Sequence, residues 1–250
     1  MKALEKTTTS ASCHRFTSMA ALLLLSALVQ GCASVPYPDR RDPLESMNRG
    51  IFEFNVALDR AVVKPVATVY HDAAPKLVRK GVNNFFNNLE DMWSAVNNAL
   101  QLRGQDTSDS VGRVLVNTTI GLLGLMDVAS DLNIERHTSN FGLTLGRWGV
   151  KPGPYLVLPV LGPSTLRDSA ALPVDWAAKP TNAIEDVPTR NGFTLVELVD
   201  KRSNLLSAGN LVEGAALDKY SFTREAYLQR RRNQVYDGNP PEEEEPAVEP

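Results

Sequence analysis

Apolar residues recur at intervals of three and four through most of the chain, which is the spacing of one face of an α-helix. Between residues 44 and 62 this spacing predicts a first helix, whose apolar positions are Leu44, Met47, Ile51, Phe54, Leu58 and Val62. We expect that helix to end near Pro65, because proline cannot donate the backbone hydrogen bond of a helix interior. The same spacing predicts the longest helix from Lys76 to Leu102.

Shorter apolar stripes predict further helices, so the chain is expected to be all-α. One should run from Asp106 toward Leu122, with Asp106, Thr107 and Ser108 as candidates to cap its start. Others are expected at 127–132, from 165 onward, at 189–207 and at 223–235. Residues 141–164, FGLTLGRWGVKPGPYLVLPVLGPS, have no helical period, and the prolines argue against a central strand. We expect one long irregular or hairpin segment there.

The N-terminal 31 residues have the pattern of an export signal. Lys2, Lys6 and Arg15 precede an uncharged run at 19–29, which is too short to span a bilayer but fits a signal-peptide core. The run ends in VQGC, the form of a lipobox, so we expect residues 1–31 to be removed and Cys32 to be lipidated. Residues 32–41 would then tether the body. The alternative is an ordinary signal peptide cleaved near Ala33.

Charge and cysteine content exclude several classes of protein. The formal net charge is −3, and six of the 29 acidic residues lie in the tail DGNPPEEEEPAVEP, residues 237–250. The body is therefore nearly neutral, and we expect no nucleic-acid partner. The tail should be disordered. The chain has two cysteines, and the predicted cleavage removes Cys13, which leaves no internal disulfide and no cysteine metal site.

We find no pattern that predicts catalysis, a cofactor or a metal centre. The chain lacks a phosphate-binding glycine loop, a GxSxG elbow and an HExxH motif. His71 and His137 stand beside polar or turn residues, where a surface or capping role is expected. Asp168 with Ser164 or Ser169 could suggest hydrolysis, but the sequence places no base beside them.

Several blocks resemble one known family. These are DPLESMNRGIFEFN with its signature residues Asp42, Pro43, Asn48, Arg49, Phe52 and Asn55, then LDRAVVKPVA, NNFFNNLED, VGRVLVNTTIGLLGLMDVAS, FGLTLGRWGVKPGPYLVLPVLGPSTLRDS and REAYLQRR. Together they cover about residues 42–232 and resemble the MlaA (VacJ) family of outer-membrane lipoproteins.

The resemblance implies a single ring-shaped helical domain, residues 42–236, embedded in the inner leaflet of the outer membrane beside trimeric porins. It implies that phospholipids which have strayed into the outer leaflet pass through a central polar channel to a soluble periplasmic carrier, which maintains lipid asymmetry. No catalysis and no cofactor are implied. Two alternatives stay open: a lipoprotein that scaffolds porins without conducting lipid, and a lipid-modifying enzyme.

Candidate residues follow from this interpretation. An asparagine face could line the channel or instead tie neighbouring loops: Asn83, Asn84, Asn87 and Asn88. The hairpin and the charged latch behind it are expected at Gly153, Pro154, Tyr155, Pro159, Gly162, Pro163, Arg167 and Asp168. We expect Tyr155 and Trp148 at a membrane interface with wet polar edges. The residues expected to face acyl chains are Phe52, Val56, Phe85 and Phe86.

Overall fold

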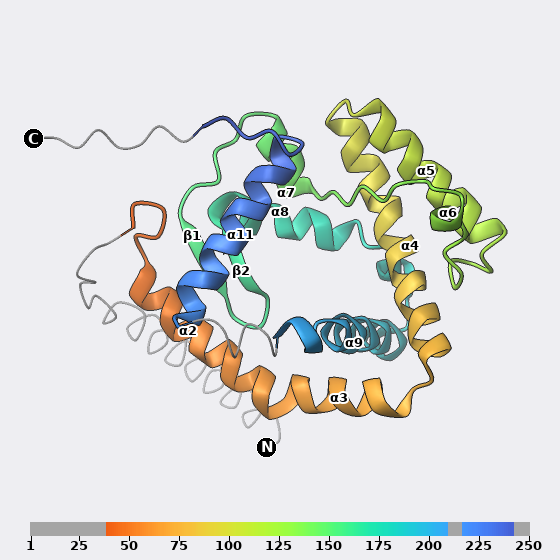
Figure 1. Ribbon diagram of the computed structural model, residues 1–250, viewed down its shortest axis with the longest axis horizontal. Coiled ribbons are helices and arrows are strands. Elements are labelled where there is room, and N and C mark those ends of the chain that lie inside the picture. Colours follow the sequence, from red (N-terminus) through yellow and green to blue (C-terminus); the bar gives the residue numbers. More distant parts are fainter. Residues whose placement is uncertain (1–38, 210–216, 243–250) are drawn as a thin grey trace, which may run out of the picture.

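The computed structural model describes residues 39–209 and 217–242, so Cys32 and the end of the acidic tail lie outside the described residues. The fold is mostly helical and forms an open ring (Figure 1). The elements are α2 (Glu45–Leu58), the π-helical turn η1 (Asp59–Val63), α3 (Lys64–Ala73), α4 (Lys76–Leu100), α5 (Gly104–Thr119), α6 (Val128–Asp131), α7 (Phe141–Arg147), β1 (Tyr155–Leu158), β2 (Gly162–Thr165), α8 (Leu166–Ala177), the 3₁₀ turn η2 (Pro180–Ala183), α9 (Val187–Asn204) and α11 (Lys219–Val235).

The first side of the ring is helical without interruption from α2 into α3. The break expected near Pro65 is therefore wrong. The π-helical turn η1 takes up the irregular hydrogen bonding, and Pro65 falls in the first turn of α3, where its missing N–H is tolerated. Arg202 of α9 holds this turn, because its Nε and Nη2 each donate to the Asp59 carboxylate at 2.7 Å.

The long helix α4 confirms the prediction from the apolar stripe, and α5 returns antiparallel to it (Figure 1). The predicted caps of α5 are wrong. The helix begins at Gly104, so Thr107 and Ser108 lie inside it, and their hydroxyls donate to the carbonyls of Arg103 and Gln105.

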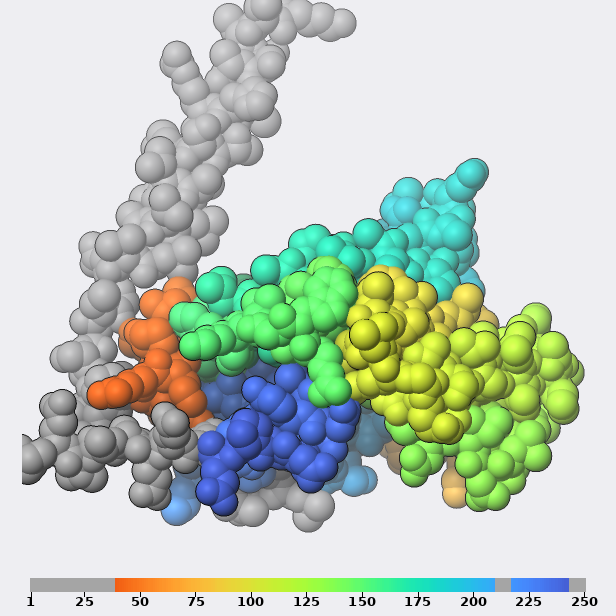
Figure 2. Space-filling view, turned by 90° about the horizontal axis from the view of Figure 1, so that it is seen from above, coloured from red at the N-terminus to blue at the C-terminus, as the bar shows by residue number. Residues whose placement is uncertain are grey.

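The segment from 141 to 164 contains a hairpin, as one of the two expectations allowed. Strands β1 and β2 pair antiparallel, with Tyr155 opposite Thr165 and Leu158 opposite Gly162. The absence of helix expected throughout this segment is wrong, because α7 forms at its start. Asn140 caps α7 by accepting from the Leu143 N–H at 3.0 Å, and seven residues are too few to show a period. Helix α11 packs against α7, and Figure 2 shows the blue C-terminal segment directly against the green segment.

Burial in this fold is inverted relative to an ordinary globular core. Among the described residues, nine hydrophobic residues are buried against 22 polar or charged ones, and 34 large hydrophobic side chains are exposed. The expected membrane-facing set is corrected in part. Phe86 is buried and packs with Phe85 and Phe193, and Phe52 packs edge-on against Tyr220. Within the described chain, none of the helices is both long and apolar enough to span a bilayer.

A turn between α5 and α6 shows the outward apolar surface most clearly. Leu122 and Leu123 have left-handed φ angles of 53° and 59°, and their side chains are 63% and 69% exposed. Ile120, Leu125 and Met126 are exposed beside them. The amides around the turn are satisfied internally, as in the bonds from Leu123 N to Thr118 O and from Met126 N to Gly121 O. The turn therefore exposes side chains while its backbone is largely self-paired.

Candidate functional site

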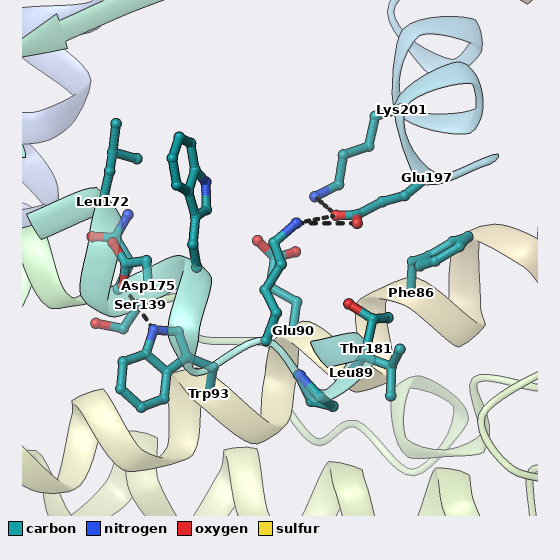
Figure 3. Close-up of a pocket in the computed structure, with 14 residues that line it drawn as sticks. Phe86, Leu89, Glu90, Trp93, Ser139, Leu172, Asp175, Thr181, Glu197 and Lys201 are labelled. Atoms are coloured by element: carbon teal, nitrogen blue, oxygen red, sulfur yellow. Dashed lines mark hydrogen bonds and ion pairs between the residues drawn. The ribbon is translucent and has the colours of Figure 1, made fainter. Parts of the chain in front are cut away.

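A cavity of about 230 Å³ lies between α4, α8, η2 and α9 (Figure 3). In the ribbon view, α4, α8 and α9 border the inside of the ring (Figure 1). Each of these elements contributes one part of the wall. The lining residues used below are Phe86, Leu89, Glu90 and Trp93 of α4, Leu172, Asp175 and Trp176 of α8, Lys179 just before η2, and Glu197 and Lys201 of α9.

One side of the cavity is aromatic and aliphatic. The Trp93 indole Nε1 donates to Asp175 Oδ1 at 2.8 Å, and the Phe141 N–H donates to the same oxygen at 2.8 Å. These bonds fix α8 and α7 against α4. Trp176 is 49% exposed and lines the same space. This side offers apolar contact together with satisfied polar atoms.

The other side carries a carboxylate shared by two ammonium groups (Figure 3). Lys201 Nζ lies 2.8 Å from Glu197 Oε1, and Lys179 Nζ lies 3.2 Å from Glu197 Oε2. Burial alone would raise the pKa of Glu197, but Lys201 and Lys179 hold that pKa below its usual value. Burial would lower the pKa of Lys201, whereas Glu90 and Glu197 raise it above the usual value. Glu197 and Lys201 are therefore both charged at neutral pH.

The cavity is amphipathic, with a charged wall facing an apolar one. Glu90 is also paired, because Arg136 Nη2 lies 3.0 Å from its Oε2. Among residues 39–209 and 217–242 no cluster of three histidine, cysteine, aspartate or glutamate side chains could hold a metal ion. His71 and His137 pair with Asp72 and Asp109.

A model of the MlaA lipoprotein family matches residues 40–234. The chain belongs to the MlaA lipoprotein family. It is 36% identical over 218 residues to the Escherichia coli K12 protein named intermembrane phospholipid transport system lipoprotein MlaA, covering 85% of this chain and 86% of that one. An uncharacterized Rickettsia bellii protein is 35% identical over 211 residues, covering 84% of this chain and 81% of that one.

A solved structure supports the same conclusion. It comes from work on the "structural basis for maintenance of bacterial outer membrane lipid asymmetry", and it superposes with a TM-score of 0.68 at 36% identity. The match covers 80% of this chain and all of the solved one. The all-α fold class is thereby confirmed, and the ring of Figure 1 is the form of an MlaA-family domain.

Two signature asparagines of this MlaA-family chain hold the hairpin against α2. Asn48 Nδ2 donates to Tyr155 O at 3.0 Å while its Oδ1 accepts from Val157 N at 2.9 Å. Seven residues further on, Asn55 Oδ1 accepts from Val160 N at 2.7 Å, and Asn55 Nδ2 donates to the carbonyl of Leu158, the last residue of β1, at 2.9 Å. Sequence reasoning missed this clamp. A spacing of seven places both amides on one helix face, which was the available signal.

The first signature residue, Asp42, joins the two ends of the domain. Its carboxylate accepts from Asn48 Nδ2 at 2.8 Å and from the Tyr220 hydroxyl, and Arg224 Nη1 lies 3.0 Å away. Arg49 lies over the Tyr220 ring at 4.3 Å. The signature block therefore fastens the start of α2 to α11, while Pro43 stays exposed.

Residues Arg167 and Asp168 form a buried latch behind the hairpin. Asp168 Oδ1 accepts from Arg167 Nε at 2.9 Å, and Oδ2 accepts from Arg231 Nε and from the Tyr227 hydroxyl, each at 2.8 Å. Burial would raise the pKa of Asp168, but the guanidinium groups of Arg231 and Arg167 lower it to about 2. Gly142 permits this approach, since a Cβ there would lie 2.7 Å from Asp168 Oδ1.

Some residues of the hairpin region matter for their backbone conformation and others for where their side chains lie. Gly153 and Gly162 have φ angles of 67° and 82°, which an L side chain rarely adopts. Tyr155 is fully buried, so its expected place at a wet interface is wrong. Trp148 is 55% exposed and donates from Nε1 to Leu100 O at 3.0 Å. The prolines of the hairpin region are Pro154 before β1, Pro159 in the turn and Pro163 in β2.

The asparagine face of α4 contacts its neighbours rather than the cavity described above. Asn84 Nδ2 donates to Leu125 O at 3.1 Å, and Asn88 Nδ2 donates to Thr118 Oγ1 at 3.0 Å. Asn83 Nδ2 donates to Asp200 at 3.0 Å, and Asn87 Nδ2 donates to Asn83 Oδ1. These bonds are those expected of residues that tie neighbouring elements. Their role in lining a channel stays a prediction.

Proposed function

We propose that this chain removes mislocalised phospholipids from the outer leaflet of the outer membrane and passes them through the ring to a periplasmic carrier for return transport. The proposal rests on the family relationship and on one structural observation. The molecule turns apolar side chains outward, buries polar ones, and has an amphipathic cavity at the inside of the ring.

The physics of lipid transfer requires these opposed environments. Each methylene exposed to water costs about 0.8 kcal/mol, and an ionic headgroup in hydrocarbon costs far more. A headgroup can cross on the charged wall of Glu197, Lys179 and Lys201 while acyl chains stay against apolar surface. The step needs no catalytic residue and no cofactor when lipid moves downhill to the carrier.

The proposed setting is the periplasmic side of the outer membrane. Lipidated Cys32 would anchor the chain, and the exposed apolar side chains would sit among acyl tails of the inner leaflet. A trimeric porin and a soluble carrier are the proposed protein partners. The name of the E. coli relative supports the transport role.

The deciding experiment measures outer-leaflet phospholipid in cells that lack the protein and in cells that carry variants. Deletion should raise the level of outer-leaflet phospholipid, and expression of the wild-type protein should bring it back to normal. Thr181 lines the cavity, so Thr181→Trp should fill the cavity and leave the level high. Thr119→Trp, at an exposed position of α5, should bring the level back to normal. Full restoration by a folded, membrane-associated Thr181→Trp protein would favour a porin scaffold without lipid conduction.

A further inference from the structure

Glu197 occupies an unusual position for a surface carboxylate. Its side chain is 15% exposed, while those of Lys179 and Lys201 are 42% and 49% exposed. Both lysines line the cavity and stay partly exposed, whereas the carboxylate between their ammonium groups is largely covered.

Helix stabilisation explains only half of this arrangement. Glu197 and Lys201 are four residues apart on α9, and such a pair contributes a few tenths of a kcal/mol to a helix. Lys179 comes from the segment before η2 and has no such relation to α9. Two cations from separate elements on one carboxylate form a ready site for a group with two or more anionic oxygens.

The charge of the cavity indicates which headgroup fits. The ionisable lining residues Glu90, Asp175, Glu197, Lys179 and Lys201 have a formal net charge of −1, and Arg136, which pairs with Glu90 from outside the lining, balances it. A headgroup with a phosphate and an ammonium keeps this balance, whereas an anionic headgroup adds an uncompensated negative charge. The volume of about 230 Å³ is below the roughly 300 to 1,000 Å³ of sites that enclose drug-sized ligands. It therefore suits a headgroup and not a whole lipid.

We propose, on the basis of the function proposed above, that this cavity is a binding site for zwitterionic phospholipid headgroups in which Glu197 is an exchangeable counter-ion. The lipid phosphate replaces Glu197 on Lys179 and Lys201, and the released carboxylate accepts the headgroup ammonium together with Glu90. Trp93 and Trp176 contact the apolar atoms beside the phosphate. Because each ion pair is replaced by another, binding is weak and reversible, as passage through a ring requires.

The test is direct binding by purified full-length protein in non-ionic detergent. Short-chain phospholipids with ethanolamine or glycerol headgroups are titrated, and the change in tryptophan fluorescence, to which Trp93 and Trp176 at the cavity contribute beside the distant Trp148, reports binding. The wild-type protein should bind the ethanolamine phospholipid more tightly than the glycerol phospholipid. Glu197→Gln frees the two ammonium groups and should tighten glycerol-lipid binding about tenfold, which removes the preference.

Lysine variants test the phosphate contact independently. Lys179→Gln and Lys201→Gln should each weaken the binding of both lipids about tenfold, which is the lower end of the range for the loss of one charge-assisted hydrogen bond. Lys201→Arg keeps the charge and should retain binding. Lys76→Gln, an exposed lysine outside the cavity lining, is the matched control and should change nothing.

The outcomes separate this inference from the proposed function. If wild type lowers outer-leaflet phospholipid in cells but Glu197→Gln leaves the headgroup ratio unchanged, the site assignment is overturned alone. Equal binding of both headgroups by wild type also overturns it. If wild type binds neither lipid and does not alter the outer leaflet, the proposed function fails as well.

Discussion

Replacing Asp168 by asparagine should destabilise the domain, because one buried carboxylate connects the hairpin end of α8 to α11. The carboxylate is 7% exposed and shared by Arg167, Arg231 and the Tyr227 hydroxyl. Asparagine keeps the shape but removes the charge, which leaves two buried guanidinium groups without their common counter-ion.

The lowered pKa of Asp168 gives the magnitude. A fall from 3.8 to about 2 corresponds to about 2 kcal/mol of folding free energy at neutral pH. Breaking a buried ion pair by removing one partner typically costs about 3 to 5 kcal/mol. We therefore expect Asp168→Asn to lower the free energy of unfolding by about 2 to 4 kcal/mol.

The pH dependence has a definite sign. A carboxylate with a lowered folded pKa stabilises the fold above its unfolded pKa of 3.8, and this stabilisation is lost as pH falls through about 2. Wild type should lose about 2 kcal/mol more than Asp168→Asn over that interval. At neutral pH the variant should unfold at a lower denaturant concentration.

The assay is equilibrium denaturant unfolding in detergent micelles at several pH values. Glu53→Gln, an exposed carboxylate on α2, is the control and should lie within about 0.5 kcal/mol of wild type. An Asp168→Asn variant that is equally close to wild type at neutral pH, or that shows an unchanged acid dependence, would refute the reasoning.

Three further predictions concern α4 and its neighbours. Arg113→Met should lower the free energy of unfolding by about 3 kcal/mol, because Arg113 is buried and pairs with buried Asp91 at 3.2 Å; denaturant unfolding measures it. Gly124→Ala should destabilise by about 2 kcal/mol in the same assay, because φ is 90° and the new Cβ would lie 2.8 Å from Asn88 Cβ. A double change of Asn84 and Asn88 to leucine should impair phospholipid removal in cells if these amides line a channel.

Each of these predictions has a contrary outcome. Unaltered unfolding of Arg113→Met would show that the buried pair contributes nothing net. For glycine, Gly192→Ala is the control, since no heavy atom lies within 4 Å of its added Cβ and the residue has ordinary φ. Unimpaired lipid removal by a stably folded asparagine double variant would leave only the tying role for that face.

Sequence reasoning found the elements whose periodicity is long. The apolar stripe along α4 predicts a helix whose end lies within two residues of the observed one. The ring is predicted through the sequence blocks that resemble the MlaA family. It failed where tertiary contacts decide. α7 has only seven residues and depends on the Asn140 cap, and the turn at η1 absorbs Pro65 in a way no stripe reveals.

The candidate site was the least predictable part. The Lys201–Glu197 pair follows from helical spacing, but Lys179 joins it only because η2 folds back toward α9. Arg231 meets Asp168 across 63 positions in the chain, which no local pattern encodes. Periodicity also cannot tell an outward apolar face from an inward one, so the sequence predicts that Phe85 and Phe86 face lipid, although they pack against Phe193.

The turn that carries Leu122 and Leu123 makes the stability of this fold depend on its solvent. Left-handed backbone costs about 1 to 2 kcal/mol for each non-glycine residue, and water returns nothing to two exposed leucines. Transfer of each side chain into hydrocarbon is worth about 1.5 to 3 kcal/mol when complete. The same conformation is therefore a net penalty in buffer, and transfer of the exposed part of the two side chains into acyl chains offsets that penalty, so a bilayer would favour the shape of this turn more than water does.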